Sequence, residues 1–500
     1  MAATTENQAA TVQGEVRMLI GGALVEGRAG KRFDTINPAT EAVLGQVADA
    51  DGDDMDLAIG AARQAFDDTT WSTDRSFRQR CIRQLHDALV GERELMRAEL
   101  VAEVGCPVAI TYGPQLDAPL EDGLLWPARA IDDLEWERDL PIGEAFGMRS
   151  WRKVLKEPVG VVGAIVPWNY PFEVTIQKLG QALATGNTVV LKPAPDTPWN
   201  ATRIGRLIAE QTDIPSGVVN VVTTSDNAVA EQLVVDPRVD LISFTGSTSV
   251  GRHIMAAGAP TMKRFFLELG GKSAHIVLDD ANLAAVVPGG AFVCVHGGQG
   301  CAMLTRMLVP RARYDEAVEL LTTGFAGITY GDPTDPGMLQ GPQISAKQRD
   351  RVLAYIDKGV AEGARLVVGG GRPAHLPKGW YVEPTLFADV TNGMAIAREE
   401  IFGPVLVVIP FDDDDDAVRI ANDNEYGLSG MVSSGSEDRA IAVAKRIRAG
   451  TVGVNGGIFY GADAPFGGYK ASGYGRQNGA EGLEQYLETK TLSGPAPAGA

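Results

Sequence analysis

Hydrophobic and polar positions near the start of the chain form two kinds of pattern. After a polar stretch that ends at about Gly14, residues 18–27 contain two short apolar runs around a Gly-Gly pair, which predicts a hairpin. Beyond it, apolar residues recur at intervals of three and four, with Asp or Glu near the start of each stretch. This periodicity predicts amphipathic helices at roughly 53–67, 74–89 and 92–103.

From residue 159 the pattern changes to short runs that are apolar throughout and that alternate with helical stretches. Strands of this kind belong to parallel sheets with helices on both faces. The first series has strands at 159–167, 187–193, 217–222, 239–246 and 273–280, and helices near 173–185, 199–211, 226–235 and 249–257. Because ligands bind at the carboxyl ends of such strands, the segments that follow them are candidate binding sites.

A second alternation of strands and helices begins after residue 304 and predicts a second α/β domain. Its strands are expected at 305–310, 365–370, 402–411 and 451–455, and its helices near 313–323, 345–362, 414–423 and 437–448. The acidic run 411–417 is expected to cap the helix that follows it. Residues 481–492 alternate like an edge strand after a short helix, which is a segment able to pair with another subunit.

Composition and charge narrow the function classes. The chain has 500 residues, of which 45% are hydrophobic and 22% charged, which indicates a globular protein of more than one domain. No apolar run approaches the roughly 20 residues that span a bilayer, and the N-terminus shows no targeting pattern. A net charge of −19 argues against nucleic acid or an anionic membrane as a partner. The four cysteines include no C-x-x-C pair, which favours a reducing compartment, so a cytoplasmic protein is expected.

The glycine-rich stretch 292–303 contains two of the four cysteines and one histidine. Cys301 follows Gly-Gly-Gln-Gly, a backbone that can turn its amide groups toward a ligand, so its thiol fits a covalent nucleophile. It also fits a small buried residue beside a turn. Cys294, His296 and Cys301 offer three metal ligands, but no fourth follows at a usual spacing, so no metal is predicted.

Other strand ends carry residues with suitable chemistry. Glu268 lies between two leucines, where desolvation would raise its pKa toward that of a general base, unless it faces water on an edge strand. Asn169 of PWNYP suits an oxyanion site, or it caps a helix that begins at Pro171. Lys192 and residues 245–249 fit a nucleotide ribose and pyrophosphate, or else ordinary strand-to-helix turns.

The order of these motifs resembles the aldehyde dehydrogenase superfamily. The series PWNYP, KPAP, FTGSTSVG, LELGGK, GQGC, EEIFGPV and PFGGYKASGYGR occupies residues 159–476, and TINPAT at 35–40 extends it. The resemblance implies an α/β fold with a Rossmann-type cofactor-binding domain, a second α/β catalytic domain and a small β oligomerisation element. The boundaries expected on this basis are a flexible tail at 1–14, a cofactor domain at 15–137 and 156–267, a catalytic domain at 268–470, and an oligomerisation element at 138–155 and 480–494.

The resemblance also implies a role for each matching residue. Cys301 would be the nucleophile, Glu268 the general base for deacylation, and Asn169 the side-chain half of an oxyanion hole completed by the Cys301 amide. Lys178 would belong to a proton relay. The expected cofactor contacts are Val166, Trp168, Lys192, Gly246, Ser247, Glu400 and Phe402. The expected substrate tunnel is lined by Tyr170, Glu173, Val174, Gln177, Gly300, Ala302, Tyr460 and Phe466.

The implied reaction is oxidation of an aldehyde to the acid with NAD, through a cysteine thiohemiacetal and a thioester that is hydrolysed. Pro195 stands where many NAD-preferring members have Glu, which leaves NADP open as the cofactor. Small residues on both sides of Cys301 indicate room for a bulky aldehyde, and Glu173 and Gln177 indicate a polar feature if they turn inward. The expected assembly is a homodimer or homotetramer.

Three other functions stay open at this point. A CoA-acylating variant would replace hydrolysis by thiolysis, although the presence of Glu268 speaks against it. A non-catalytic paralogue would keep the scaffold and lose the nucleophile or the base. A cysteine hydrolase without cofactor would need a histidine beside Cys301, for which His253, His275 and His296 are candidates. His296 stands where the family often has Asn, and the sequence gives it no role.

Overall fold

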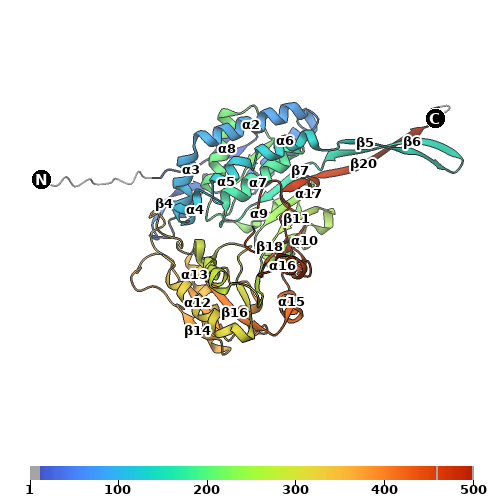
Figure 1. Cartoon of the computed structure of the whole chain (residues 1–500). Coiled ribbons are helices and arrows are strands. Elements are labelled where there is room, and N and C mark those ends of the chain that lie inside the picture. Colours follow the sequence, from blue (N-terminus) through green and yellow to red (C-terminus); the bar gives the residue numbers. More distant parts are fainter. Residues whose placement is uncertain (1–11, 458–459, 498–500) are drawn as a thin grey trace.

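Two large sheets and a projecting arm organise the chain in the computed structural model, which describes residues 12–457 and 460–497 (Figure 1). Helices cover both faces of each sheet, so the predicted α/β fold is confirmed. The first sheet belongs to the upper unit of Figure 1 and the second to the lower one. Most of the predicted N-terminal tail, residues 1–11, lies outside the described residues.

The first sheet has eight strands, of which the central five are parallel. Their order across the sheet is β19 (Gly473–Tyr474), β11 (Arg264–Glu268), β10 (Leu241–Thr245), β7 (Val161–Ile165), β8 (Thr188–Lys192), β9 (Val219–Val221), β1 (Met18–Ile20) and β2 (Ala23–Val25). β1 and β2 form the predicted hairpin. A short separate ribbon pairs β3 (Arg32–Ile36) with β4 (Val43–Ala48).

The second sheet has seven strands, and all its pairs are parallel except the one at the β14 edge. Its order is β14 (Arg365–Val368), β15 (Thr385–Ala388), β16 (Val405–Phe411), β13 (Arg306–Pro310), β12 (Ala274–Val277), β17 (Ser429–Ser433) and β18 (Thr451–Val454). The strand predicted at 273–280 was grouped with the first series, and this grouping is wrong, because β12 pairs with β13 and β17 of the second sheet.

The arm is a three-stranded antiparallel sheet that extends away from both units (Figure 1). Its order is β20 (Leu487–Pro495), β6 (Met148–Pro158) and β5 (Glu137–Ala145). The C-terminal segment that alternates like an edge strand therefore pairs with β6 of its own chain. Its other edge has no partner strand in the described part of the chain.

The helices of the first unit are α1 (Gly52–Asp68), α2 (Arg75–Gly91), α3 (Arg93–Glu99), α4 (Val108–Thr111), α5 (Asp117–Asp122), α6 (Leu125–Asp133), α7 (Pro171–Ala184), α8 (Trp199–Gln211), α9 (Asn227–Val235) and α10 (Thr248–Gly258). Those that follow are α11 (Leu283–Val286), α12 (Tyr314–Ala326), α13 (Ala346–Ala361), α14 (Ala395–Arg398), α15 (Asp414–Asn422), α16 (Glu437–Ala444) and α17 (Gly479–Glu484). Shorter turns are the π-helix η1 (Leu100–Val104) and the 3₁₀ segments η2 (Ala259–Thr261), η3 (Val287–Gly298), η4 (Arg311–Arg313) and η5 (Lys470–Ser472).

Most predicted helices begin where a side chain caps the first turn. Asp51 accepts hydrogen bonds from the amides of two first-turn residues of α1, and Asp74 caps α2 by accepting from the Phe77 amide. The predicted cap in the acidic run is confirmed, since Asp413 caps α15. Two predicted ends differ: the helix at 92–103 changes to a π-helix at residue 100, and α16 stops at residue 444.

Alternation along the parallel strands explains why each sheet has two apolar faces. Val162 and Val189 pack into a core with helices α2, α6, α7 and α8, whereas Val161 and Val190 face a second core with α1, α9 and α10. The second sheet divides its strand residues between two further cores in the same manner. Both faces are therefore occupied, and strand ends are the positions left for binding.

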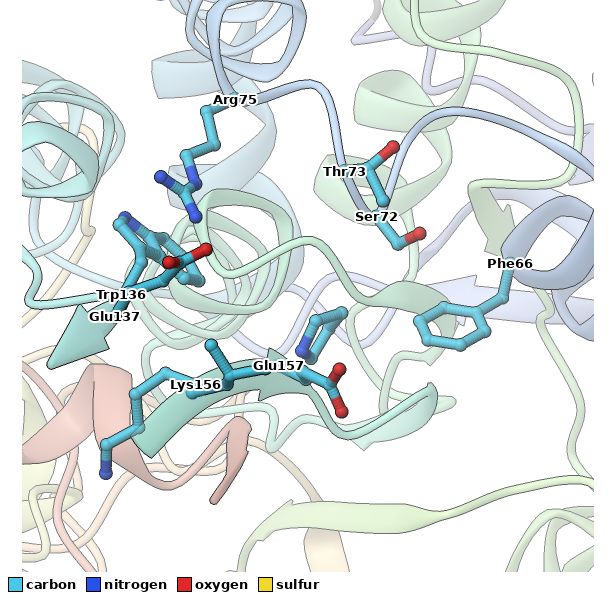
Figure 2. Close-up of a pocket in the computed structure, with 10 residues that line it drawn as sticks. Phe66, Ser72, Thr73, Arg75, Trp136, Glu137, Lys156 and Glu157 are labelled. Atoms are coloured by element: carbon cyan, nitrogen blue, oxygen red, sulfur yellow. The ribbon is translucent and has the colours of Figure 1, made fainter. Parts of the chain in front are cut away.

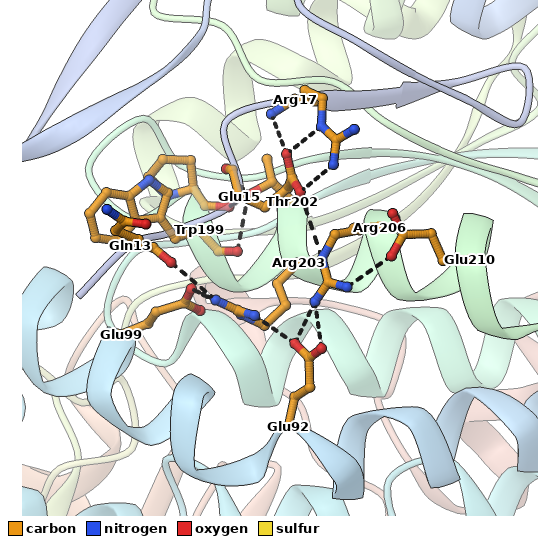
Figure 3. A network of polar contacts seen from close by, with 11 residues as sticks. Gln13, Glu15, Arg17, Glu92, Glu99, Trp199, Thr202, Arg203, Arg206 and Glu210 are labelled. Atoms are coloured by element: carbon orange, nitrogen blue, oxygen red, sulfur yellow. Dashed lines mark hydrogen bonds and ion pairs between the residues drawn. The ribbon is translucent and has the colours of Figure 1, made fainter. Parts of the chain in front are cut away.

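A buried ion network fixes α8 behind the first sheet (Figure 3). Arg203 pairs with Glu92 at 2.5 Å and also with Glu99, which is completely buried. Arg203 also donates to the Gln13 carbonyl at 3.3 Å, which attaches the N-terminal segment. Burial raises the pKa of Glu99, and Arg203 offsets part of this effect, so the two residues depend on each other.

Candidate active site

A cavity of about 520 Å³ lies where the carboxyl ends of the first sheet's parallel strands meet the second unit. Most of the predicted site residues line it. From the predicted catalytic group these are Cys301, Glu268 and Asn169. From the predicted cofactor group they are Trp168, Gly246, Ser247, Glu400 and Phe402. From the predicted substrate group they are Tyr170, Glu173, Val174, Gln177, Tyr460 and Phe466.

The structure does not bring five predicted residues to the cavity lining: Val166, Lys178, Lys192, Gly300 and Ala302. Val166 and Lys192 lie at neighbouring strand ends, where the Val166 amide donates to the Lys192 carbonyl at 3.1 Å. Gly300 and Ala302 flank Cys301 in the chain, and of these three residues only Cys301 lines the cavity. Lys178 does not reach the lining, but its positive charge lowers the pKa of Glu268.

Sequence reasoning missed three basic residues at one end of the cavity, Arg252, Lys347 and Arg351. Arg252 lies on α10 one turn beyond Thr248, so helical phase from the predicted Ser247 site could have indicated it. Lys347 and Arg351 are four residues apart on α13, which shows that they share a face. Nothing local indicates that this face meets the first unit.

The glycines before Cys301 are required by the shape of the chain. His296, Gly297 and Gly298 all have left-handed backbone conformations, with φ of 55°, 65° and 72°. A Cβ atom at Gly298 would lie 2.1 Å from the Gly403 carbonyl carbon, so no other residue fits there. The turn ends at Cys301 and directs its thiol into the cavity.

Asn169 is held by hydrogen bonds on both its side chain and its backbone. Its Nδ2 donates to the Gln299 carbonyl at 2.8 Å, next to the Cys301 turn. Its backbone carbonyl accepts from Gln115 Nε2 at 2.8 Å and lies 2.9 Å from His296 Nε2. The helix-cap alternative is wrong, because Tyr170 is the N-cap of α7. Asn169 and Cys301 are therefore fixed relative to each other.

His296, which the sequence left without a role, positions Asn169. Its pKa is lowered to about 4 by burial, so the ring is neutral at pH 7 and its Nε2–H can donate to the Asn169 carbonyl. The ring also packs edge-on against Tyr170, with centroids 5.4 Å apart. The other two candidate histidines contact residues elsewhere: His253 contacts Glu231 and His275 contacts Ser433. No triad-like base for a cysteine hydrolase is therefore formed in the described part of the chain.

We expect His296→Asn to lower the free energy of unfolding by about 1–3 kcal/mol, because one hydrogen bond to a buried carbonyl is lost. Asn tolerates the left-handed backbone at this position, so the effect reports the ring contacts. Urea denaturation of both proteins measures it. The control is the exposed His253→Asn, which should change stability by less than about 0.5 kcal/mol. Equal stability of His296→Asn and the unaltered protein would contradict the positioning role.

Glu268 ends β11 and is buried, with 4% of its surface exposed. The water-facing alternative is wrong, since β11 lies between β10 and β19. Burial raises its pKa to about 8, and the positive charges of Lys178 and Arg476 oppose this shift. Its Oε1 atom has no hydrogen-bond partner among the described residues, which leaves it available to a water or substrate.

Lys178 is completely buried, and burial lowers its pKa to about 7 while Glu268 opposes the shift. Its Nζ donates to Ser243 Oγ at 3.0 Å, and Ser243 Oγ lies 2.9 Å from the Tyr486 hydroxyl. Burial therefore shifts the pKa of both groups toward neutrality, and the charge of each group opposes the shift of the other.

The Cys301 thiol lies among carboxyl groups. Desolvation raises its pKa well above the usual value, and Glu268, Glu400 and Glu173 add to this in that order. A hydrogen bond from the Ala302 amide acts in the opposite direction. The thiol is protonated at neutral pH, so a nucleophilic thiolate needs a base, and Glu268 is the carboxyl whose charge acts most strongly on the thiol.

The other end of the cavity fits a nucleotide. Ser247 caps α10, whose N-terminus is the kind of site that binds anions, and Arg252, Lys347 and Arg351 line the same cavity. Trp168 and Phe402 pack edge to face at 5.4 Å. Glu400 Oε1 accepts from the Gly271 amide at 2.9 Å, which fixes this carboxyl between the two units.

A second cavity of about 490 Å³, at the base of the arm, offers different chemistry (Figure 2). Arg75 covers the Trp136 ring at 4.4 Å, and the other polar lining residues are Ser72, Thr73, Glu137, Lys156 and Glu157. No cysteine or histidine is among its lining residues. The cavity at Cys301 is therefore the candidate active site.

The described residues offer neither a metal centre nor a membrane-spanning helix beside this site. Within residues 12–457 and 460–497, no group of three or more His, Cys, Asp or Glu side chains could hold a metal ion. In the same residues, no helix has the length and apolar character needed to cross a membrane. All four cysteines are free.

Comparisons with known proteins give one consistent family. A model of the aldehyde dehydrogenase family matches residues 24–492. A 3-succinoylsemialdehyde-pyridine dehydrogenase of a Pseudomonas species is 42% identical over 95% of this chain and 98% of its own. The crystal structure of a Mycobacterium tuberculosis aldehyde dehydrogenase complexed with NAD⁺ is 41% identical, with a TM-score of 0.92 over 97% of this chain and 99% of that one. Betaine aldehyde dehydrogenase of Staphylococcus aureus in complex with NAD⁺ is 34% identical, with a TM-score of 0.93 over 98% and 96% of the two chains.

Proposed function

This chain belongs to the aldehyde dehydrogenase family, and we propose that it oxidises an aldehyde to the carboxylic acid with NAD, through a covalent thioester on Cys301. The observation that carries this proposal is that Cys301, Asn169 and Glu268 face one cavity from three separate segments. A thiol, an amide donor and a desolvated carboxyl are the groups that acyl chemistry on an aldehyde carbon requires.

The first steps use the thiol and the amide. Glu268 takes the thiol proton, and the Cys301 sulfur bonds to the aldehyde carbon, which places a negative charge on the former carbonyl oxygen. Asn169 Nδ2 and the Cys301 backbone amide donate hydrogen bonds to that oxygen. Because Asn169 is fixed by Gln299 and His296, little reorganisation is needed as the charge develops.

The cavity end with Ser247, Glu400 and Phe402 would hold the dinucleotide, which supplies the hydride acceptor that no side chain provides. Hydride loss converts the thiohemiacetal to a thioester. Glu268 must first release the thiol proton to solvent before it can act as a base again. It then removes a proton from water, which attacks the thioester carbon, and the leaving Cys301 thiolate takes this proton back from Glu268 as the acid is released.

We further propose NAD as the preferred cofactor over NADP. Pro195 stands after β8 where many NAD-preferring members have a carboxylate. The next residue, Asp196, supplies a negative charge that acts on Lys192. Burial lowers the Lys192 pKa to about 8, and Asp196 opposes the shift. A carboxylate beside Lys192 would repel a 2′-phosphate, as an acid does in other dinucleotide sites.

The domain division, assembly and location stay proposals. We propose residues 15–137 and 156–267 as the cofactor domain, 268–470 as the catalytic domain, and 138–155 with 480–494 as the oligomerisation element of a cytoplasmic homodimer or homotetramer. Apolar side chains exposed on the arm support the assembly, including Phe146, which is 98% exposed, Met148 and Trp151. Light scattering on the purified protein would return a monomer mass if this is wrong.

The test of the function is a matrix of aldehydes against NAD and NADP, with kcat/KM measured from nicotinamide absorbance. We expect turnover with NAD, a kcat/KM for NADP at least about tenfold lower, and no rate increase on adding CoA. No turnover with any aldehyde and either cofactor would reject the proposal. Acceleration by CoA would instead favour the acylating variant.

A further inference from the structure

One part of the cavity wall carries polar groups that the proposed reaction does not use. Glu173 and Gln177 lie one turn apart on α7, and Tyr460 comes from the segment after β18. Gln177 Nε2 donates to the Tyr460 hydroxyl at 3.0 Å and to Glu173 Oε1 at 3.4 Å. All three line the cavity together with Cys301, so the inward direction that the sequence left open is the one adopted.

The Glu173 carboxyl is buried in the wall, and no basic side chain among the described residues pairs with it. It is 6% exposed, and burial raises its pKa to about 8. The other groups that act on this pKa are Tyr460, which donates a hydrogen bond, and Glu268, whose negative charge opposes ionisation. Glu268 differs, because Lys178 and Arg476 act on it. A buried acid that faces a cavity with only neutral donors around it lacks the cation that such groups normally pair with.

A purely structural role explains this residue less well. Glu173 lies in the first turn of α7, where an acid stabilises the helix dipole. An acid serves that purpose equally at an exposed position, where no desolvation cost arises. The Glu173 carboxyl instead faces the cavity, in contact with Gln177, which in turn contacts Tyr460. This position adds a desolvation cost, which a bound ligand can offset.

We propose that Glu173 determines substrate specificity, and that the substrate is an aldehyde whose other end carries a basic amine that pairs with the Glu173 carboxyl. This inference rests on the proposed function. The ammonium group supplies the missing cation, and Gln177 and Tyr460 hold the carboxyl toward it. The remaining wall, formed by Tyr170, Val174 and Phe466, is mainly apolar and fits the hydrocarbon chain between the amine and the aldehyde.

The test compares two aldehydes of the same shape, 4-(dimethylamino)butanal and 5-methylhexanal, which differ by a basic nitrogen in place of a CH group. We expect the unaltered enzyme to have the higher kcat/KM for the amine. Glu173→Gln keeps the size and hydrogen bonds of the side chain but cannot become an anion. The variant should lower kcat/KM for the amine by about 10- to 100-fold, which is the range for a hydrogen bond to a charged group. Its kcat/KM for 5-methylhexanal should stay within about threefold of that of the unaltered enzyme.

The matched control is Glu121→Gln, at an exposed position on α5. It should leave kcat/KM unchanged for both aldehydes. Equal loss for both aldehydes with Glu173→Gln would overturn the inference and assign the residue to the stability of α7. A preference of the unaltered enzyme for 5-methylhexanal would overturn it without any variant. Both results leave aldehyde oxidation intact, whereas absence of turnover with every aldehyde would reject the proposed function itself.

Discussion

Cys301→Ser is expected to lower kcat for aldehyde oxidation by at least about a thousandfold, since removing a covalent nucleophile leaves only the binding contributions of the site. A serine hydroxyl is a much weaker nucleophile near neutral pH, and the carboxyl groups that raise the Cys301 pKa would disfavour its ionisation as well. Steady-state kinetics with the best aldehyde measures the effect.

Cys294→Ser is the matched control for this result. Cys294 lies in the same glycine-rich stretch but is completely buried in the core between the second sheet and α12. We expect the kcat of Cys294→Ser to stay within about threefold of that of the unaltered enzyme, because Cys294 does not reach the cavity. NAD binding by Cys301→Ser, followed by calorimetry, should be unchanged. Residual oxidation above about one tenth of the original rate would contradict the nucleophile assignment.

The second large effect is expected from Glu268→Gln, which should lower kcat by about 100- to 10,000-fold, the range for loss of a general base. Because Glu268 is proposed to take the Cys301 proton as well as a proton from water, the variant should also form its first NADH per active site slowly. Rapid-mixing absorbance would show no fast burst of NADH. A full burst followed by slow turnover would limit Glu268 to thioester hydrolysis and would contradict its role as the base for the thiol. The exposed Glu319→Gln is the control and should behave as the unaltered enzyme.

The raised pKa of Glu268 predicts that kcat of the unaltered enzyme depends on pH. Because burial raises that pKa to about 8, the carboxyl is mostly protonated at lower pH and cannot act as a base. The ionised fraction grows as the pH rises, so kcat should increase by up to about tenfold per unit until it levels off near pH 8. Glu268→Gln should lose this dependence. A kcat that is level from about pH 6 to 8 in the unaltered enzyme would contradict a base with this pKa.

Local sequence patterns predicted most elements because their signals lie within a few residues. The capping residues Asp51, Asp74 and Asp413 accept hydrogen bonds from first-turn amides of their own helices. The spacing of apolar residues also distinguishes helix from strand within a short segment. The strand at 273–280 was equally clear as an element, but its sheet was not. β12 joins the second sheet because its partners, β13 and β17, come later in the chain.

The candidate site shows the same division. Motif order indicated Cys301, Glu268 and Asn169 through a family resemblance, and the structure places all three at one cavity. Motif order could not show that Asn169 is tied to Gln299, or that His296 donates to the Asn169 backbone, because these hydrogen bonds join residues about 130 positions apart. The basic residues of α13 were missed for the same reason.

The sequence by itself therefore determined the kinds of elements, the strand ends where a site can form, and the residue types that make aldehyde chemistry possible. Only the tertiary structure decided which of those residues are desolvated. Whether Glu268 has an ordinary pKa or one of about 8, and whether Glu173 faces water or the cavity, depends on neighbours such as β19 and Tyr460 that packing brings from distant segments. Removal of water by such neighbours is a property of the packed chain, which no local pattern contains.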